Sequence, residues 1–316
     1  MKSTKKQNIS FIGFGEAAMT FVKGWGEAGG SNLKAYDIKT DSPSKEVRQQ
    51  KSCDYEQSGV TGCKSLHSAL KDAHVIFSLV TADQALIAAK NTASHITPNT
   101  LYLDCNSCAP DTKRCAAVLI SNTGARYVDV AVMAPVQENL QKVPILMSGP
   151  HGDMALPVLE SLTMTASLLS AEVGDASSVK MMRSIMIKGM EALMMECLLS
   201  ARKAGVEEVV INSLENSFPE FSFKEKAAYM LERVTTHGLR RAAEMREVAK
   251  TVDQLGLDGD MARATAEWQQ KIGELEINPQ AKENYEKLTD RILANLEEKE
   301  ELKQNIKSWP VKFLMG

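Results

Sequence analysis

Near the start of the chain stands the stretch Asn8-Ile9-Ser10-Phe11-Ile12-Gly13-Phe14-Gly15-Glu16-Ala17-Ala18, which decides the fold. Its first five residues are mostly apolar and predict a short strand, and the apolar spacing from Ala17 to Ala28 predicts a helix. Between them, Gly13 allows a tight turn, Gly15 keeps the backbone open to a ligand, and the small Ala18 lets the helix pack closely on the strand. The stretch therefore predicts the first strand, loop and helix of a parallel α/β unit.

This glycine loop predicts a dinucleotide site, because the N–H groups and positive dipole end of the following helix attract a pyrophosphate. The second predicted strand, Leu33–Tyr36, ends at Asp37. A carboxylate there accepts hydrogen bonds from ribose hydroxyls and repels a 2′-phosphate, so we expect NAD, with NADP as an alternative because Lys39 is near. A glycine turn in another class of α/β protein is the competing interpretation. The residues expected at the cofactor are Gly13, Phe14, Gly15, Glu16, Ala17, Ala18, Asp37, Lys39, Val80 and Thr81.

Further apolar runs in the first half have the length of buried strands. They are Val75–Val80, Leu101–Leu103, Tyr127–Val132 and Val143–Met147, and helical patterns separate them. Alternation of continuous apolar strands with helices predicts a parallel sheet covered on both faces. We therefore expect a doubly wound Rossmann domain over residues 1–173.

The second half of the chain has a helical pattern throughout. Ala176–Ala204 predicts one long helix that ends at Gly205, and further helices are predicted at 224–254, 259–273 and 279–307. Residues 174–316 are thus expected to form an all-helical domain that begins with a long interdomain helix, binds substrate and forms a homodimer. The methionines of the long helix are expected in its core: Met181, Met182, Met186, Met190 and Met194.

The composition is that of a globular protein. Of 316 residues, 44% are hydrophobic and 24% charged, and the formal net charge is −3. Neither a long basic run nor a long apolar run is present, so nucleic acid and membrane are not expected as partners. The basic residues 1–6 precede too short an apolar stretch for a signal peptide, which predicts a cytoplasmic protein. Cys105 and Cys108 form a C-x-x-C, but a redox or zinc site lacks its other ligands, so no metal is expected.

Four segments give the sequence a resemblance to a known family. They are Gly13–Ala18, Asp104–Pro110, Asp129–Pro135 and Gly174–Ser184. Together they resemble the β-hydroxyacid dehydrogenase superfamily of 3-hydroxyisobutyrate and 6-phosphogluconate dehydrogenases. The C-terminal half is most similar to a branch with a domain of unknown function. The resemblance implies an NAD(P)-dependent oxidoreductase that transfers a hydride between the cofactor and a small, anionic hydroxy acid or sugar-acid derivative.

The resemblance also implies roles for particular residues. Lys180 matches the lysine that acts as general acid and base, with Lys188 two helical turns later as the runner-up. Ser184 stands where the family has asparagine, on the same helix face as Lys180 and Lys188, and is expected to keep the hydrogen-bonding role of that asparagine in catalysis. Asn106 and Ser107 match its substrate-binding motif, where a helix cap is the alternative role for Ser107. Met133-Ala134-Pro135 replaces the usual Ser-Gly-Gly turn, so Met133 is expected to line a changed substrate pocket.

A polar stripe in the second half suggests where an anion binds. His237, Arg240, Arg241 and Glu244 fall on one face of a predicted helix. Two arginines can clamp a carboxylate or phosphate, with His237 close to the substrate. A solvated or dimer-interface face is the alternative.

Two other functions fit parts of the sequence. The serine at position 184 is compatible with an imine or ketimine reductase of the same fold, although the resemblance implies that those enzymes generally lack the lysine. The altered turn after Val132 is compatible with a non-catalytic protein that binds NAD as a sensor.

Overall fold

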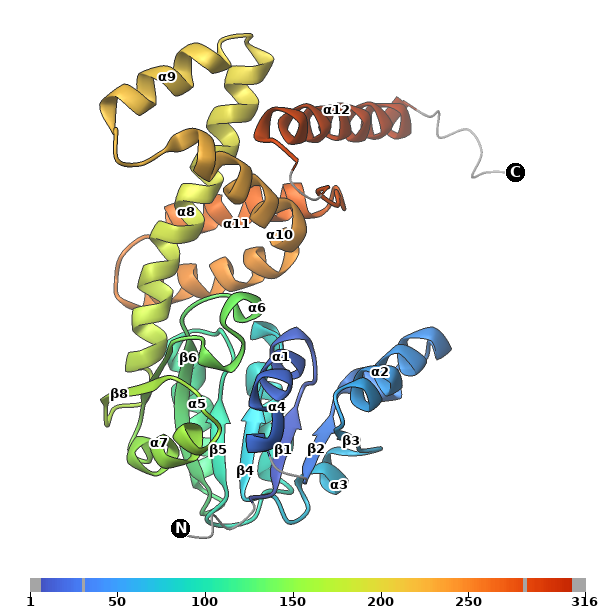
Figure 1. The fold of residues 1–316 in the computed structure, drawn as a ribbon, viewed down its shortest axis with the longest axis vertical. Helices are drawn as coiled ribbons and strands as arrows, with labels where there is room; N and C mark the ends of the chain where they lie inside the picture. Colours follow the sequence, from blue (N-terminus) through green and yellow to red (C-terminus); the bar gives the residue numbers. More distant parts are fainter. Residues whose placement is uncertain (1–6, 30–31, 281–282, 309–316) are drawn as a thin grey trace. The chain divides into compact units, whose positions relative to one another are not determined.

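An eight-stranded sheet forms the centre of the first part of the chain (Figure 1). Its strands lie in the order β3-β2-β1-β4-β5-β6-β7-β8, and all neighbours are parallel except β6 and β7. This confirms the doubly wound α/β fold, with one antiparallel pair that the sequence did not indicate. The strands are β1 (Ile9–Ile12), β2 (Leu33–Tyr36), β3 (Thr61–Gly62), β4 (Val75–Ser78), β5 (Leu101–Asp104), β6 (Arg126–Val132), β7 (Ile145–Ser148) and β8 (Ala166–Ser170).

The structure is a computed structural model and describes residues 7–29, 32–280 and 283–308, with side chains as far as residue 301. The basic residues 1–6 and the last side chains of the C-terminal helix lie outside the described part. The chain divides into two units, of which the first is Met1–Arg183 with Lys250–Leu257 and the second is Ser184–Ala249 with Asp258–Gly316. The long helix α8 (Asp175–Lys203) contributes its first residues to one unit and the rest to the other.

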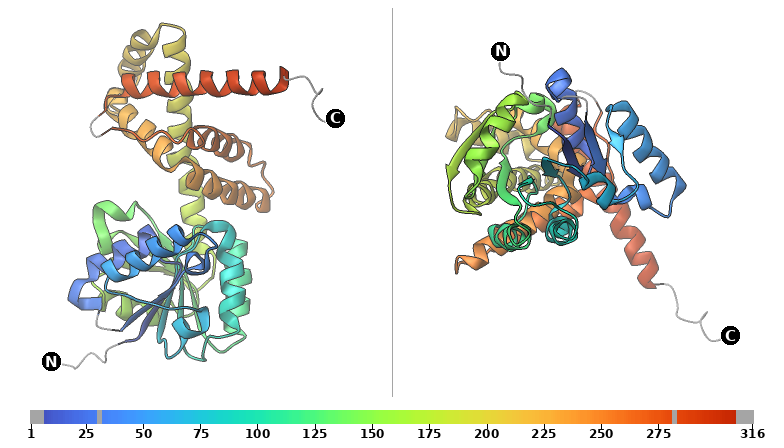
Figure 2. Two further views of the ribbon diagram at one scale, coloured as in Figure 1. Left: turned by 90° about the vertical axis from the view of Figure 1, so that its right-hand side faces the viewer. Right: turned by 90° about the horizontal axis from the view of Figure 1, so that it is seen from below.

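Helices cover both faces of the sheet (Figure 2). One face packs against α1 (Glu16–Trp25), α2 (Lys45–Gln57), α6 (Val136–Asn139) and α7 (Gly152–Ser161). The other packs against α3 (Leu66–Leu70), α4 (Ala85–Ala93) and α5 (Pro110–Ser121). Short 3₁₀ turns lie at Gly26–Gly29, Ile38–Asp41, Ala82–Gln84 and Leu140–Lys142.

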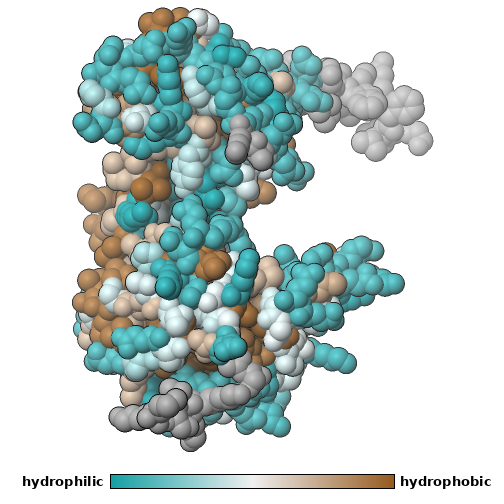
Figure 3. Space-filling view, in the orientation of Figure 1, coloured by the Kyte–Doolittle hydropathy of each residue, from teal (hydrophilic) through white to brown (hydrophobic). Residues whose placement is uncertain are grey.

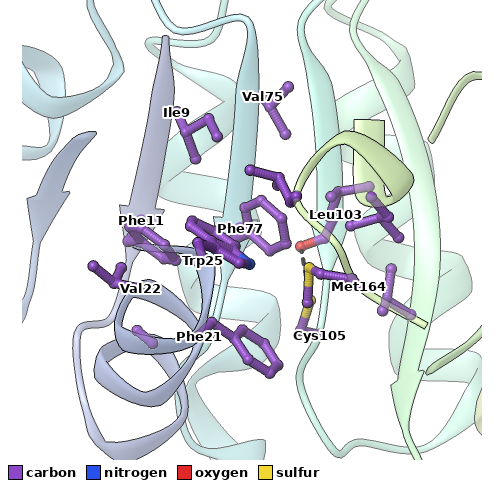
Figure 4. Packing of buried hydrophobic residues seen from close by; sticks show 14 of the residues in the cluster. Ile9, Phe11, Phe21, Val22, Trp25, Val75, Phe77, Leu103, Cys105 and Met164 are labelled. Atoms are coloured by element: carbon purple, nitrogen blue, oxygen red, sulfur yellow. Dashed lines mark hydrogen bonds between the residues drawn. The ribbon is translucent and has the colours of Figure 1, made fainter. Parts of the chain in front are cut away.

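Alternate residues of the central strands point to opposite faces, as the pleat requires. Phe11 and Phe77 join the core on the α1 side, whereas Ile76 joins the core on the α5 side. The Phe11 ring stacks on both Phe77 and Trp25, with ring centroids 5.6 Å apart in each case (Figure 4). Burying each such ring contributes about 1.5–3 kcal/mol, so this cluster fixes α1 firmly on the sheet.

The second unit is all-helical. Besides the later part of α8 it contains α9 (Glu207–Ser217), most of α10 (Phe223–Gln254), α11 (Asp260–Gly273) and α12 (Tyr285–Ser308). Its core includes Met195, Leu231 and Ile292. At one crossing, a methyl group on Gly238 of α10 would lie 2.7 Å from the Cα of Gly273 of α11, so both helices need glycine there. Within the described residues, no helix is long and apolar enough to cross a membrane.

Two expectations for the helical part were wrong or incomplete. Met186 is 62% exposed and does not join the core, whereas Ser184 and Lys188 are only 7% and 8% exposed. Ser184 and Lys188 therefore lie on the inward side of α8, where Lys188 meets the carboxylate of Glu244 within the helical unit. Helix α9 was not predicted; it begins two residues after Gly205, at which the long helix was expected to end.

Candidate active site

The glycine loop follows β1 and meets the end of β4. Gly13 has φ +79° and donates its N–H to the carbonyl of Tyr36 at 2.9 Å. A methyl group on Gly13 would lie 2.8 Å from both the carbonyl carbon of Leu79 and Cγ1 of Val80. The chain therefore requires glycine here for its own packing. The loop lies at the carboxyl end of β1, between β2 on one side and β4 on the other, where the strand order reverses and ligands bind in doubly wound sheets.

Gly15 is different, because nothing in the chain itself requires glycine at this position. Its φ of −103° suits any residue, and a methyl group there would meet no atom within 4 Å. It is the residue before α1, and no side chain caps that helix start. Open backbone at an uncapped helix N-terminus fits the approach of a pyrophosphate, so the residues present suit a dinucleotide. Behind the loop, Ala18 is fully buried against the sheet, whereas Glu16 and Ala17 are half-buried.

The N–H and the carbonyl of Phe14 are both hydrogen-bonded to side chains. Its N–H donates to Asp37 Oδ2 at 2.8 Å, and its carbonyl accepts from Lys51 Nζ at 2.5 Å. The ring itself is fully buried, 5.3 Å from that of Tyr55. Asp37 Oδ1 also accepts from the N–H of Lys39 at 2.9 Å. The expected ribose carboxylate is thus tied to the glycine loop, and the N–H of Phe14 is committed to it.

Asn106 joins the loops that follow β4 and β5. Its Oδ1 accepts from the N–H of Val80 at 2.7 Å, while its Nδ2 donates to Ser78 Oγ at 3.0 Å and to Asp104 Oδ1 at 2.7 Å. Both amide hydrogens are committed within the chain, and the residue is 3% exposed. Asn106 therefore holds these two loops together, and its contact with substrate stays a prediction. Thr81, the next expected cofactor residue after Val80, is exposed.

Ser107 and Lys180 meet at the same end of the sheet. Lys180 Nζ donates to Ser107 Oγ at 2.6 Å. Ser107 is half-buried between Asn106 and Cys108, both of which are buried. Since Ser107 follows Asn106, and Asn106 holds Val80 beside Gly13, the pair lies next to the glycine loop within the first unit. An ammonium and a hydroxyl in contact form a group that can bind and protonate a substrate oxygen.

The runner-up lysine has different partners, all within the second unit. Lys188 Nζ lies 2.6 Å from Glu244 Oε2 and donates to Ser184 Oγ at 3.3 Å. The ion pair is mostly buried, so Lys188 is held by a carboxylate.

The expected anion clamp is split between two environments. Arg241 is 7% exposed and forms an ion pair with Glu191, and burial lowers the pKa of its guanidinium. Arg240 is exposed and His237 is half-buried. The two arginines thus do not present a joint surface. Met133, after β6, is half-buried, and its N–H donates to the carbonyl of Pro144 at 2.9 Å.

A buried ionic cluster was missed from the sequence. It consists of Asp104, Lys113 and Asp129, which are all fully buried. A signal was present, because Lys113 lies on the same helical face as the buried Pro110, Ala116 and Ile120. A lysine in such a position requires a buried carboxylate partner.

Cys105 and Cys108 are both buried free thiols. Burial raises the pKa of the Cys105 thiol to about 12. No group of three or more metal-binding side chains occurs in the described part of the chain.

Comparison with known proteins identifies both parts of the chain. Residues 8–170 match the family model described as the NAD binding domain of 6-phosphogluconate dehydrogenase. Residues 201–272 match a domain of unknown function, DUF1932. The pair confirms the resemblance to this dehydrogenase group and to its branch with an uncharacterised C-terminal domain.

Individual relatives cover most of the chain. A conserved hypothetical protein from Sinorhizobium meliloti 1021 is 33% identical, covers 93% of this chain and 98% of its own, and superposes with a TM-score of 0.70. An uncharacterised 28.5 kDa protein from Methanothermus fervidus is 26% identical over 81% of this chain and 95% of its own. The 3-hydroxyisobutyrate dehydrogenase of Mycobacterium tuberculosis, solved with L-serine, shares the fold at 14% identity, with a TM-score of 0.68 over 91% of this chain and 99% of its own.

Proposed function

The chain belongs to the family of the NAD-binding domain of 6-phosphogluconate dehydrogenase and is an NAD(P)-dependent oxidoreductase of that family; we propose that its substrate is a small hydroxy acid or sugar-acid derivative and that Lys180 is its general acid and base. The observation that carries the proposal is the 2.6 Å hydrogen bond from Lys180 Nζ to Ser107 Oγ, beside the glycine loop. It brings a proton donor to the end of the sheet where a dinucleotide fits.

When bound, the nicotinamide ring accepts or donates the hydride. The chain must then handle the proton on the substrate oxygen. Lys180 takes that proton as the neutral amine when a hydroxyl is oxidised, and the ammonium so formed returns it when a carbonyl is reduced. Ser107 accepts from Lys180 and keeps its own hydroxyl hydrogen, which it donates to the substrate. Lys188 is less suited to this role because Glu244 holds it.

A carboxylate or phosphate also needs a cation. Of the two arginines on α10, Arg241 is held by Glu191 and Arg240 is exposed, so within the second unit we assign anion binding to Arg240, with His237 one helical turn before it. Met133 takes the position of a serine in the usual turn, so an apolar thioether lines the pocket here. This substitution favours a substrate with an apolar group at that point.

We propose NAD as the preferred cofactor. Asp37 places a carboxylate at the end of β2, and it is oriented by the N–H groups of Phe14 and Lys39. A fixed negative charge there disfavours the 2′-phosphate of NADP.

We also propose a cytoplasmic homodimer. All six cysteines are free thiols, which suits a reducing compartment. On α8, Met186 and Leu193 are 62% and 58% exposed and lie seven residues apart, on one side of the helix. Apolar surface gathers along α8 in Figure 3. Exposed apolar residues at such spacing favour contact with a second copy.

The test is a substrate screen of the purified protein. We expect NAD-dependent oxidation of at least one small hydroxy acid, followed by NADH absorbance, with the acid replaced by its amide as a matched control for the anionic group. Reduction of cyclic imines without oxidation of any acid would favour the imine reductase alternative. NAD binding without turnover of any compound would favour the sensor.

A further inference from the structure

The ammonium of Lys113 is enclosed by two carboxylates. It donates to the main-chain carbonyl of Asp104 at 2.5 Å and to Asp104 Oδ1 at 2.9 Å, and it lies 3.3 Å from Asp129 Oδ1. All three side chains have no exposed surface. Burial alone would lower the pKa of Lys113, but the two carboxylates outweigh it and raise that pKa above its usual value. The group is therefore a permanent buried cation.

One cation between two carboxylates leaves one formal negative charge, and the start of α8 supplies hydrogen-bond donors that stabilise this charge. Asp129 Oδ2 accepts from the N–H groups of Gly174 and Ser177 at 3.2 and 3.0 Å, and Asp129 Oδ1 accepts from Ser177 Oγ at 2.6 Å. These donors belong to the positive end of a helix dipole. Asp129 thus acts as a helix cap supplied by the sheet.

The cluster reaches both partners of the candidate acid–base pair. Asp104 Oδ1 accepts from the N–H and Nδ2 of Asn106, the residue before Ser107. Asp129 holds Ser177, which lies one helical turn before Lys180. Lys113 joins the two carboxylates, so a short path of contacts runs from Ser107 through the cluster to the turn that carries Lys180.

We propose that Lys113 is a positioning residue, which sets the distance between Lys180 and Ser107 by fixing the start of α8 to the loop after β5. This inference rests on the proposed role of Lys180. A purely structural role would make Lys113 important for folding but would leave the geometry of the pair unchanged in any variant that folds. The two roles therefore predict different behaviour of the Lys180 amine.

The experiment measures the rate at which Lys180 is modified by an amine reagent, relative to the exposed Lys64, by mass spectrometry of the ligand-free protein. In Lys113→Met we expect the relative modification rate of Lys180 to rise about tenfold. The reason is that the start of α8 shifts and the hydrogen bond from Lys180 to Ser107 no longer holds the Lys180 amine. Ser177→Ala, which keeps all three charged groups, removes one neutral hydroxyl and should raise the rate in the same direction. Lys90→Met removes an exposed lysine from α4 and should leave the rate unchanged.

Turnover gives a second and separate readout. Because a displacement of about 1 Å can lower a rate about 100-fold, kcat should fall in the Lys113 and Ser177 variants while the KM for NAD stays within twofold. If Lys113→Met does not fold, Ser177→Ala decides the outcome. An unchanged Lys180 modification rate in a folded variant would overturn the proposal. Absence of any turnover in the wild type would count against the proposed function only, since the modification rate needs no substrate.

Discussion

Lys180 Nζ and Ser107 Oγ are 2.6 Å apart, although the two residues are separated by 73 positions in the sequence. Ser107 lies on the loop after β5, and Lys180 lies in the second turn of α8. The contact therefore depends on how the start of α8 is attached to the sheet.

Replacing Lys180 by Met should remove the proton donor without disturbing the cofactor loop. We expect kcat to fall by about 10²- to 10⁴-fold, the range typical of general acid–base groups, with the Kd for NADH within twofold of wild type. Steady-state kinetics and NADH fluorescence titration measure the two quantities. Turnover near the wild-type value would remove Lys180 from the mechanism.

Lys188→Met is the matched control, since it removes a lysine of the same helix. It removes the mostly buried ion pair with Glu244, so we expect lower thermal stability but a much smaller loss of kcat. If this variant loses more turnover than Lys180→Met, the assignment of the two lysines must be exchanged.

The two glycines of the loop should respond in opposite ways to alanine. Gly15→Ala meets no neighbouring atom and should leave the Tm almost unchanged, but it should raise the Kd for NADH at least about tenfold because the methyl group occupies the pyrophosphate approach. Gly13→Ala has a positive φ and crowds Leu79, so it should unfold at a clearly lower temperature. Equal Tm losses in the two variants would contradict this distinction.

Asp37→Asn tests the origin of cofactor preference, because the amide keeps the shape of the side chain and removes its charge. The NADP Kd should fall and the NAD Kd should rise, shifting their ratio at least about tenfold toward NADP. Lys39→Ala is the complementary variant and should weaken NADP alone. Fluorescence titration with both reduced cofactors gives the ratios, and an unchanged ratio in Asp37→Asn would assign the preference to other residues.

The cysteines should differ sharply in reactivity. With a pKa of about 12, the Cys105 thiol has a thiolate fraction of about one in ten thousand at pH 8, and raising the pH to 9 still leaves it almost fully protonated. Iodoacetamide should therefore modify the exposed Cys53 and Cys115 first, and Cys105 and Cys108 only after unfolding. Rapid modification of Cys105 in the native protein would revive a redox role for the C-x-x-C.

Self-association should depend on the exposed side of α8. Leu193→Lys places a charge on the proposed dimer face and should convert the protein to a monomer in sedimentation experiments at micromolar concentration. Ile87→Lys changes an exposed apolar residue of α4, in the first unit, and should have no effect on association. A wild-type protein that sediments as a monomer would exclude the dimer.

The sheet was predictable from the sequence because its strands are continuous apolar runs with clear ends. The bounds expected for the second strand, Leu33–Tyr36, agree with the structure. By contrast, β3 has only two residues and β8 has no buried residue, so neither shows a buried-strand pattern. The antiparallel direction of β7 follows from the chain path after β6, which local patterns do not encode.

Side-chain roles were harder to predict because they depend on partners far along the chain. The spacing of Lys180, Ser184 and Lys188 placed them on one side of α8, but only the fold shows that Lys188 meets Glu244 while Lys180 meets Ser107. Asn106 was expected to bind substrate because it matches the substrate-binding motif of the family that the sequence resembles. Its hydrogen bonds to Ser78, Val80 and Asp104 become visible only when β4 and β5 lie side by side.

The double attachment of Phe14 has a consequence for how a ligand is received. Its peptide is tied on one side by Asp37 and on the other by Lys51, and its ring is sealed in the core. A loop that is already ordered loses little conformational entropy when a ligand arrives, so less of the interaction energy is offset. The glycine loop is thus a preformed binding site, and we expect cofactor binding to proceed without reordering of this loop.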